Sequence, residues 1–255
     1  MPRRHMLFAC GVLTMLCAPL ANAQTSDRGW IDVNFVSSTP AQDEQTLSFD
    51  FPLFGETASA AAAYPKFPRV SGSLIGGGVR ILGGLGAGVQ FTPVKYEYTV
   101  GLGVNIPHPT IFNRFASDSD VTSSALERTD QALDISASFQ LPTPDTWRVR
   151  VFGGPTYFRV KQDFVSVIRF SQVYNQVGGN VVNITGFDQE TVDETAWGFH
   201  VGADVAYFFS RHFGVGGGIR VNNGTLTLEN EPLTGAEADI ALGSTLVGAG
   251  LRLRF

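Results

Sequence analysis

From Gly29 onward, apolar and polar residues alternate one by one, and this period of two constrains the fold more than any other feature of the chain. In the run 247–255, valine, alanine, leucine and phenylalanine take the odd positions, while glycine and arginine take the even ones. Side chains of a strand point to alternate faces, whereas a helix repeats about every 3.6 residues. The pattern therefore predicts strands, and it recurs at residues 31–35, 75–81, 85–91, 133–140, 147–151, 197–207, 213–221 and 247–255.

These eight runs predict a barrel in a membrane rather than a soluble sheet. Each has an apolar face, and the sequence offers no amphipathic helices to cover such faces. Each is close to the roughly 10 residues that a tilted strand needs to cross hydrocarbon. Short connections at 82–84, 142–146 and 210–212 alternate with long segments at 38–69, 97–129, 166–193 and 225–241. We therefore expect an all-β fold: one antiparallel transmembrane β-barrel of eight strands, with short periplasmic turns and long extracellular loops.

The first 23 residues have the three parts of a secretory signal peptide. Arg3 and Arg4 precede an apolar stretch at 6–20, and residues 21–23, Ala-Asn-Ala, form a small-residue cleavage site. We therefore divide the chain into a signal peptide, residues 1–23, and a barrel domain, residues 24–255. Both cysteines lie in the signal, so the barrel has no disulfide or cysteine metal site. Removal of the signal leaves 16 basic and 23 acidic side chains, and this net charge of −7 argues against a nucleic-acid partner.

Aromatic residues near the ends of the runs indicate the two membrane interfaces, because amphipathic rings prefer that depth. The residues expected on the periplasmic side are Trp30, Trp147, Phe209, Phe213 and Phe255. Those expected nearer the outer side are Tyr96, Tyr157 and Trp197.

One run departs from simple alternation. Arg148 and Arg150 occupy even positions, whereas Arg159 and Lys161 occupy odd ones. A β-bulge at 153–155, Gly-Gly-Pro, would insert one residue and turn the later charges inward again. Alternatively, Arg159 and Lys161 stand above the membrane, in a strand that extends into the outer loop.

By their parity, ten side chains point into the barrel and form a predicted lumen charge network: Asp32, Arg80, Asp134, Arg148, Arg150, His200, Asp204, Arg220, Arg252 and Arg254. An eight-stranded barrel is just wide enough for its own side chains, so acids and arginines should pair there. The network either fills the lumen structurally or lines a route for small anions. His200 shares a face with Asp204, as a hydrogen-bond partner or in a catalytic dyad. The sequence has no phosphate loop or metal-ligand cluster, and we expect no catalytic residue, cofactor or metal.

The most specific segments are the terminal GAGLRLRF at 248–255, VFGGP at 151–155 and VGADV at 201–205. With the signal peptide and the eight runs, they make the chain resemble the OmpA-like small β-barrel family. The resemblance implies an eight-stranded barrel of the bacterial outer membrane, often structural or adhesive. It also implies that Leu251, Leu253 and Phe255 form the signal that the barrel-assembly machinery recognises. Because the sequence ends at Phe255, we expect no peptidoglycan-binding domain to follow.

These features predict a non-enzymatic outer-membrane protein with a structural or surface-interaction, adhesion-like role. The alternatives are a narrow channel for small solutes and, less favoured, a lipid A-modifying enzyme. The expected partners are outer-membrane lipid, the barrel-assembly machinery and an extracellular ligand held by the long loops.

Two long-loop segments could take part in contacts, because one contains several aromatic residues and the backbone of the other is stiffened by two prolines. The first, with Phe49, Phe51, Phe54 and Tyr64, folds back on the rim or on lipid headgroups, or it binds a host or cell-envelope partner. The second, 106–115 around His108, packs over the barrel mouth or forms a contact site.

Overall fold

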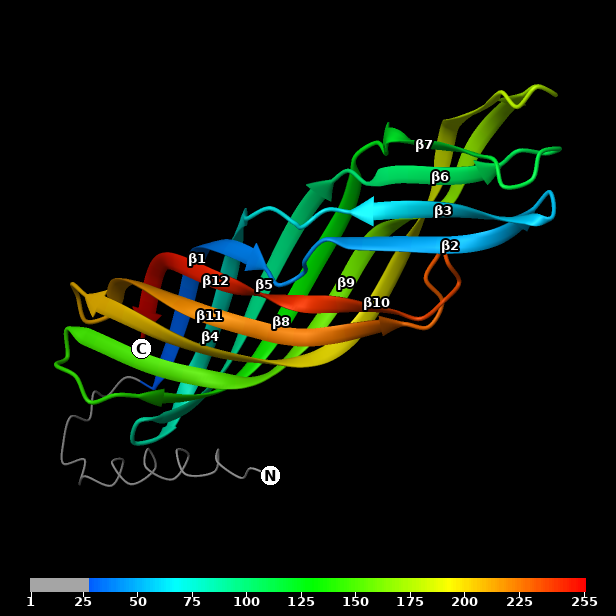
Figure 1. The fold of residues 1–255 in the computed structure, drawn as a ribbon. Coiled ribbons are helices and arrows are strands. Elements are labelled where there is room, and N and C mark those ends of the chain that lie inside the picture. Colours follow the sequence, from blue (N-terminus) through cyan, green and yellow to red (C-terminus); the bar gives the residue numbers. More distant parts are fainter. Residues whose placement is uncertain (1–27) are drawn as a thin grey trace, which may run out of the picture.

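The computed structural model describes residues 28–255, so the predicted signal peptide lies outside the described residues. The described chain forms twelve strands (Figure 1): β1 (Gly29–Pro40), β2 (Gln45–Leu53), β3 (Glu56–Tyr64), β4 (Val70–Leu82), β5 (Leu85–Tyr98), β6 (Gly101–Pro107), β7 (Phe115–Thr122), β8 (Leu126–Gln140), β9 (Trp147–Tyr174), β10 (Asn180–Phe208), β11 (Phe213–Leu228) and β12 (Ala238–Arg254). Eight of them close a barrel in the order β1-β12-β11-β10-β9-β8-β5-β4. The other four form a separate sheet in the order β2-β3-β6-β7.

The eight-stranded antiparallel barrel predicted from the alternation is confirmed. β1 pairs with β12 from Trp30 opposite Arg254 to Pro40 opposite Ser244, which joins the two ends of the chain into one wall. Short turns connect β4 to β5, β8 to β9 and β10 to β11, as expected. Because the ring is closed, every wall strand has a hydrogen-bonded neighbour on both sides, as hydrocarbon surroundings require.

The long connections consist mostly of strands. Segments 38–69 and 97–129 contain the hairpins β2–β3 and β6–β7, which pair with each other through β3 and β6. Segment 166–193 is a continuation of β9 and β10. In segment 225–241, residues 225–228 and 238–241 continue β11 and β12, and residues 229–237 form the loop between them. Figure 1 shows the four-stranded sheet standing beyond one end of the barrel, beside the extended β9 and β10. We call this part of the molecule, the sheet with the extended strand ends, the extension.

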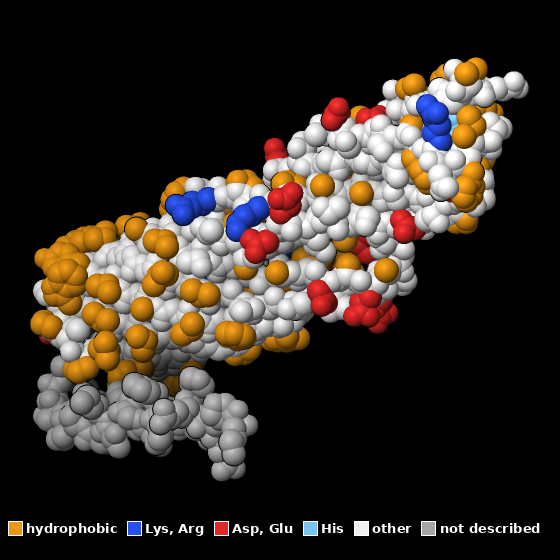
Figure 2. Space-filling model, in the orientation of Figure 1, with side chains coloured by type: hydrophobic (Ala, Val, Ile, Leu, Met, Phe, Trp, Pro, Cys, Tyr) orange, Lys and Arg blue, Asp and Glu red, His pale blue; other side chains and the backbone are white. Residues whose placement is uncertain are grey.

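An exposed apolar band surrounds the barrel, and two aromatic pairs mark its limits. Trp147 and Tyr207 lie edge to face with ring centroids 5.2 Å apart, and Tyr157 and Trp197 do so at 5.3 Å. The two pairs are ten residues apart on β9, about the length that a tilted strand needs to cross a bilayer. Figure 2 shows hydrophobic side chains covering this end of the molecule.

Two aromatic residues predicted at the interfaces face inward instead. Trp30 lies in the lumen, where the Arg150 guanidinium is 4.9 Å from its ring centre. Tyr96 is buried in the upper barrel, with 2% of its surface exposed. Both predictions were wrong because they rested on the position of each residue along its strand and not on the face to which it points. The even-numbered residues of β1 and β5 point inward.

Beyond the apolar band, β9 exchanges its polar and apolar faces. Up to Tyr157 its outward side chains are mostly apolar, but Arg159 and Lys161 are exposed on that same face. On the inward face, the polar lumen gives way to the buried Phe158 and Val160. Water replaces hydrocarbon outside at this level, so the apolar face must turn inward to be buried.

The bulge proposed at 153–155 is absent. Asp134 lies opposite Thr156, and Gln140 lies opposite Arg150, so β8 and β9 keep one register across the segment. Of the two explanations for the changed parity, the strand that extends above the membrane is the one the structure contains.

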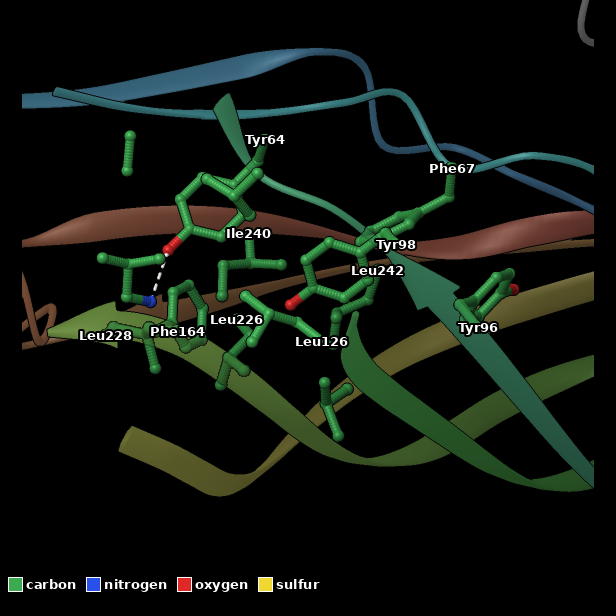
Figure 3. Close-up of a cluster of buried hydrophobic side chains, with 14 of the residues drawn as sticks. Tyr64, Phe67, Tyr96, Tyr98, Leu126, Phe164, Leu226, Leu228, Ile240 and Leu242 are labelled. Atoms are coloured by element: carbon green, nitrogen blue, oxygen red, sulfur yellow. Dashed lines mark hydrogen bonds between the residues drawn. The ribbon is translucent and has the colours of Figure 1, made fainter. Parts of the chain in front are cut away.

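The extension has an apolar core of its own (Figure 3). The core is closed from the barrel side by inward residues of β5, β8, β9, β11 and β12, and from the sheet side by β3 and β6. Its largest buried members are Tyr64, Phe67, Tyr96, Tyr98, Leu126, Phe158, Phe164, Leu226, Leu228, Ile240 and Leu242. Farther out, a smaller cluster packs Ala58, Ala60, Val104 and Ile106 of the sheet against Val182 of β10.

The turn between β2 and β3 holds a phenylalanine in an unfavourable conformation. Leu53 pairs with Glu56, which leaves Phe54 and Gly55 as the two turn residues, with φ of 54° and 80°. Turns with two positive φ values favour asparagine or glycine at the first position. The left-handed region costs most other residues about 1–2 kcal/mol, and the Phe54 ring remains 50% exposed.

We expect Phe54→Asn to stabilise the β2–β3 hairpin by about 1 kcal/mol, because asparagine tolerates the left-handed region. Amide hydrogen exchange of the hairpin should slow by about fivefold. Phe112→Asn, which also removes an exposed ring but leaves the turn unchanged, is the matched control. Equal exchange in the two variants would contradict the strain at Phe54.

Candidate functional site

The lumen charges form two clusters inside the apolar band. The first joins Asp32 of β1 and Asp204 of β10 to Arg148 and Arg150 of β9 and Arg252 of β12. Arg148 and Arg150 donate to the two carboxylate oxygens of Asp32 at 3.0 and 2.5 Å. Arg252 donates to Asp204 at 2.5 Å. All five side chains are more than nine-tenths buried, and ion pairs this deep are tolerated because charged donors surround each carboxylate.

The second cluster surrounds Asp134 of β8. Thr156 of β9 donates to Asp134 Oδ1 at 2.6 Å, and Arg220 of β11 donates to Oδ2. Arg220 also donates to Gln90 Oε1 at 2.9 Å and to Thr92 Oγ1 at 2.6 Å, both on β5. This network therefore spans the bore from β11 to β5.

His200 belongs to the second cluster rather than beside Asp204. Its Nδ1 lies 2.9 Å from Thr156 Oγ1, and its Nε2 lies 2.9 Å from Ser136 Oγ. Because Thr156 gives its hydroxyl hydrogen to Asp134, His200 Nδ1 donates to Thr156, and Ser136 donates to Nε2. Serine beside a histidine base is also the arrangement that acyl transfer uses. Ser136 and His200 are only 5% and 2% exposed, however, so the geometry supports a buried hydrogen-bond chain.

The other two predicted network members, Arg80 and Arg254, lie near the ends of β4 and β12. Arg80 donates to Gln140 Oε1 at 2.7 Å. Arg254 donates to the carbonyls of Arg211 and Asp145 at 2.8 and 2.9 Å. The Arg254 guanidinium also lies 4.0 Å from the centre of the buried Phe208 ring, and the Arg148 guanidinium of the first cluster lies 5.2 Å from the same centre. The structure thus brings together eight of the ten predicted residues.

The neutral partners of these charges were missed. They occupy the same inward parity, but the prediction considered charged groups and His200 only. The missed residues are Trp30, Asn34, Gln90, Thr92, Ser136 and Thr156.

Inward glycines make room for Trp30. A Cβ atom on Gly78 would lie 2.3 Å from the indole Cζ2, and one on Gly86 would lie 2.9 Å from Cη2. The glycines therefore permit an aromatic ring to fill the bore.

Little free volume remains in the lumen. One cavity of about 40 Å³ is lined by Asp32, Arg150, Arg220 and Arg252 among others, and a second of about 20 Å³ lies nearer Phe158. The first has space for about three water molecules, which could serve the buried Nε atoms of Arg150 and Arg220. An acyl chain or a sugar does not fit a cavity of this size.

The apolar core of the extension covers the outer end of the lumen. Three of its tyrosines are buried, and two of them also make hydrogen bonds to the backbone of β9. Tyr64 Oη accepts a hydrogen bond from Val165 N at 3.0 Å, and Tyr98 Oη donates to Asp163 O at 2.5 Å. Burial raises the pKa of Tyr64 and of Tyr98 above the ordinary value, and it raises the pKa of Tyr96 to about 12.

The three residues of the predicted assembly signal lie where the barrel closes. Leu251 and Phe255 are 60% and 61% exposed, and Leu253 is half-buried. Phe255 exchanges backbone hydrogen bonds with Gly29 at 2.8 and 3.0 Å. Their recognition by an assembly machinery stays a prediction.

At the far end of the extension, three hairpin tips are tied together. Asn113 N, between β6 and β7, donates to Glu56 Oε1 beside the β2–β3 turn at 2.8 Å. His108 Nδ1 accepts from two backbone amides, and its Nε2 donates to Asn175 O in the β9–β10 turn at 3.0 Å. His108 is 1% exposed, so the start of segment 106–115 packs, but at the distal end rather than over the barrel mouth. Residues 112–115 of the same segment remain exposed.

We expect Phe158→Ala to destabilise the folded barrel by about 3–5 kcal/mol, because it opens a cavity where the polar lumen meets the apolar core. Its neighbour Tyr157 points outward, so Tyr157→Ala should cost only about 1 kcal/mol, mainly through the lost contact with Trp197. Urea unfolding in lipid vesicles measures both. Equal losses would contradict the opposite burial of the two rings.

We also expect the extension to lose stability at alkaline pH. A raised folded-state pKa means that the stabilisation by each buried phenol is complete below the ordinary tyrosine pKa of 10.0 and is lost as the pH rises through its folded-state pKa. That pKa is about 12 for Tyr96, and the pKa values of Tyr64 and Tyr98 are raised in the same direction. Tyrosinate absorbance and near-ultraviolet circular dichroism, followed across that window, should change together. Tyr64→Phe with Tyr98→Phe should weaken this pH dependence, and an unchanged profile would exclude these phenols as its cause.

Two other kinds of feature are absent from the described residues. Among residues 28–255, no group of three or more histidine, cysteine, aspartate or glutamate side chains is arranged to hold a metal ion. Over the same residues, no helix is long and apolar enough to cross a membrane.

Comparison with known proteins agrees with this architecture. A family model described as outer membrane protein beta-barrel domain matches residues 8–255. OprG from Pseudomonas aeruginosa aligns with a TM-score of 0.51 and 9% identity, over 90% of this chain and 96% of that one. Neisserial surface protein A aligns with a TM-score of 0.43 and 13% identity, over 89% and 97%.

Identities this low concern the fold alone, and no curated protein matches the sequence. The family match covers the whole barrel, and the apolar band, the closed ring and the short turns are those of its members. The chain therefore belongs to the outer membrane protein beta-barrel family, and it is a protein of the bacterial outer membrane.

Proposed function

We propose that this protein is a closed, non-enzymatic barrel that anchors a rigid extension above the outer membrane for interaction with another surface. The observation that carries the proposal is the apolar core of the extension, which lies over the outer end of the lumen. A solute path would have to pass through that core.

Two barriers in series support a closed lumen. Within the apolar band, buried arginine–carboxylate pairs cross the bore from β1 to β9 and from β8 to β11. Above it, side chains such as Tyr98 and Phe158 are packed to 6% and 3% exposure. The narrow-channel alternative requires both barriers to open, and breaking a buried ion pair is costly.

The construction of the extension supports a role outside the membrane. The β2-β3-β6-β7 sheet packs its apolar face against β9 and β10, and Asp118 Oδ2 accepts from Ile184 N at 2.7 Å across the contact. A sheet that buries one face in this way is stable as a projecting body. Disordered loops can close a barrel as well as an ordered sheet can. An ordered sheet is needed to hold a binding surface in a fixed position.

The enzyme alternative has one supporting feature, the contact between Ser136 and His200. Its burial and the small lumen cavities favour a non-enzymatic role. For partners, we propose lipid around the apolar band, the assembly machinery acting on the strand that ends at Phe255, and an extracellular partner of the extension.

The test separates interaction from conduction. Replacing residues 45–64 and 101–122 by short glycine–serine linkers removes the four-stranded sheet and leaves the barrel strands. Bacteria displaying this variant should lose attachment to cells or coated surfaces that bind the unaltered protein. A linker of equal length at Asp145, in a turn at the opposite end, is the control and should leave attachment unchanged.

The unaltered protein in a planar bilayer should show only small or intermittent conductance, because side chains fill an eight-stranded bore. Large, stable openings together with unchanged attachment after sheet removal would replace this proposal by the channel alternative. Heat-modifiable electrophoretic mobility checks that each variant is folded.

A further inference from the structure

We propose that the distal tips of the extension insert apolar side chains into the lipid of a second bilayer facing the cell. This inference rests on the proposed surface-interaction function and names its partner as a lipid surface. Three residues carry it, one at the end of each hairpin: Phe54, Phe112 and Val177. We call them the apolar tips. They are 50%, 72% and 92% exposed.

Phe54 is the first indication that these side chains serve a purpose. It occupies a turn position with φ of 54°, where asparagine or glycine would be favoured. Backbone strain of this kind clusters at functional sites. The strain holds an aromatic ring at the end of the hairpin, where half of its surface remains exposed.

The tips are also held in fixed positions relative to one another. The hydrogen bond from Asn113 to Glu56 joins the Phe112 loop to the Phe54 turn. The hydrogen bond between His108 and Asn175 joins the same loop to the hairpin that carries Val177. Asn175 Oδ1 in addition accepts from Val177 N at 3.0 Å. Apolar groups ordered in advance lose little conformational entropy when they bind.

Their arrangement suits a bilayer better than a protein pocket. The hairpin ends that carry the three residues lie at the outermost part of the molecule (Figure 1), and their side chains are exposed. A fluid lipid surface accepts such separate groups without a complementary shape. Arg114, beside Phe112, is exposed and can meet a lipid phosphate. Figure 2 shows basic and hydrophobic side chains together at this end. The Glu56 carboxylate at the tips accepts a hydrogen bond from Asn113 N.

The tips cannot serve as anchors to the protein's own membrane. From Tyr157, at the edge of the apolar band, β9 continues to Tyr174. At about 3.3 Å per residue this is roughly 55 Å of strand. The tips therefore stand far from the bilayer that the barrel spans.

The experiment uses the full barrel in nanodiscs, mixed with vesicles of phosphatidylcholine, with and without phosphatidylserine, and separated by flotation. The test variant combines Phe54→Asn, Phe112→Ser and Val177→Ser. The first of these relieves the strained turn, so a loss of binding cannot come from a weakened hairpin. Val167→Ser is the control, since Val167 is an exposed apolar residue on β9 away from the tips.

We expect the unaltered protein and the control to float with both kinds of vesicle. The affinity of the triple variant for the vesicles should fall at least about tenfold. Because residues 24–255 contain no cysteine, Phe112→Cys can carry a single environment-sensitive dye, whose emission should shift to the blue on vesicle addition.

Failure of the unaltered protein to bind vesicles, or equal binding by the triple variant, overturns the inference. If attachment to cells still depends on the four-stranded sheet but is abolished by protease treatment of those cells, the partner is a protein and the proposed function survives without this inference. Pairing of nanodiscs in the absence of vesicles, detected by light scattering, points instead to a second copy and likewise overturns it.

Discussion

Backbone hydrogen bonding in hydrocarbon is the constraint on which the rest of this structure depends. Amide and carbonyl groups inside a bilayer have no water to bind, so strands can cross only as a closed ring. Here the ring is closed by the first and last strands, β1 and β12. Eight strands leave a bore that side chains nearly fill. The polar residues that face it must therefore satisfy one another, and the ion pairs of Asp32, Asp134 and Asp204 follow from that requirement.

A second consequence arises because the same strands continue beyond the bilayer. Inside hydrocarbon the apolar side chains face outward, whereas in water they must face inward. β9 meets both requirements in one uninterrupted strand, with Tyr157 at the boundary: Arg150 is inside below it and Arg159 is outside above it. The molecule therefore consists of a membrane barrel and a β-structure exposed to water, and the same strands run through both parts. The polar filling of the first and the apolar core of the second together close the bore.

This division also separates two kinds of role within one chain. The two lumen clusters together connect seven strands, β1, β5 and β8 to β12, through buried polar and charged groups, and their geometry is suited to holding the wall together. The distal hairpins carry exposed aromatic and aliphatic groups on a framework fixed by Glu56, His108 and Asn175. In the proposed function, the buried groups support the wall, and the exposed groups at the greatest distance from it meet the partner.

The alternation of residues determined much of this protein by itself: eight crossing strands, their direction, the short turns, and the inward position of Asp134 or Arg220. These features depend on near neighbours, because side-chain direction in a strand follows parity. Only the tertiary structure decided which inward groups meet. His200 contacts Thr156 and Ser136 rather than Asp204, since partners across a bore depend on strand order and stagger. Residues 45–53 alternate as well, but a strand in water and a strand in lipid carry the same period of two. The segment's place in a separate sheet, with Phe54 at its tip, is fixed by pairing with β3 and by packing against β9 and β10, contacts that connect residues far apart along the chain.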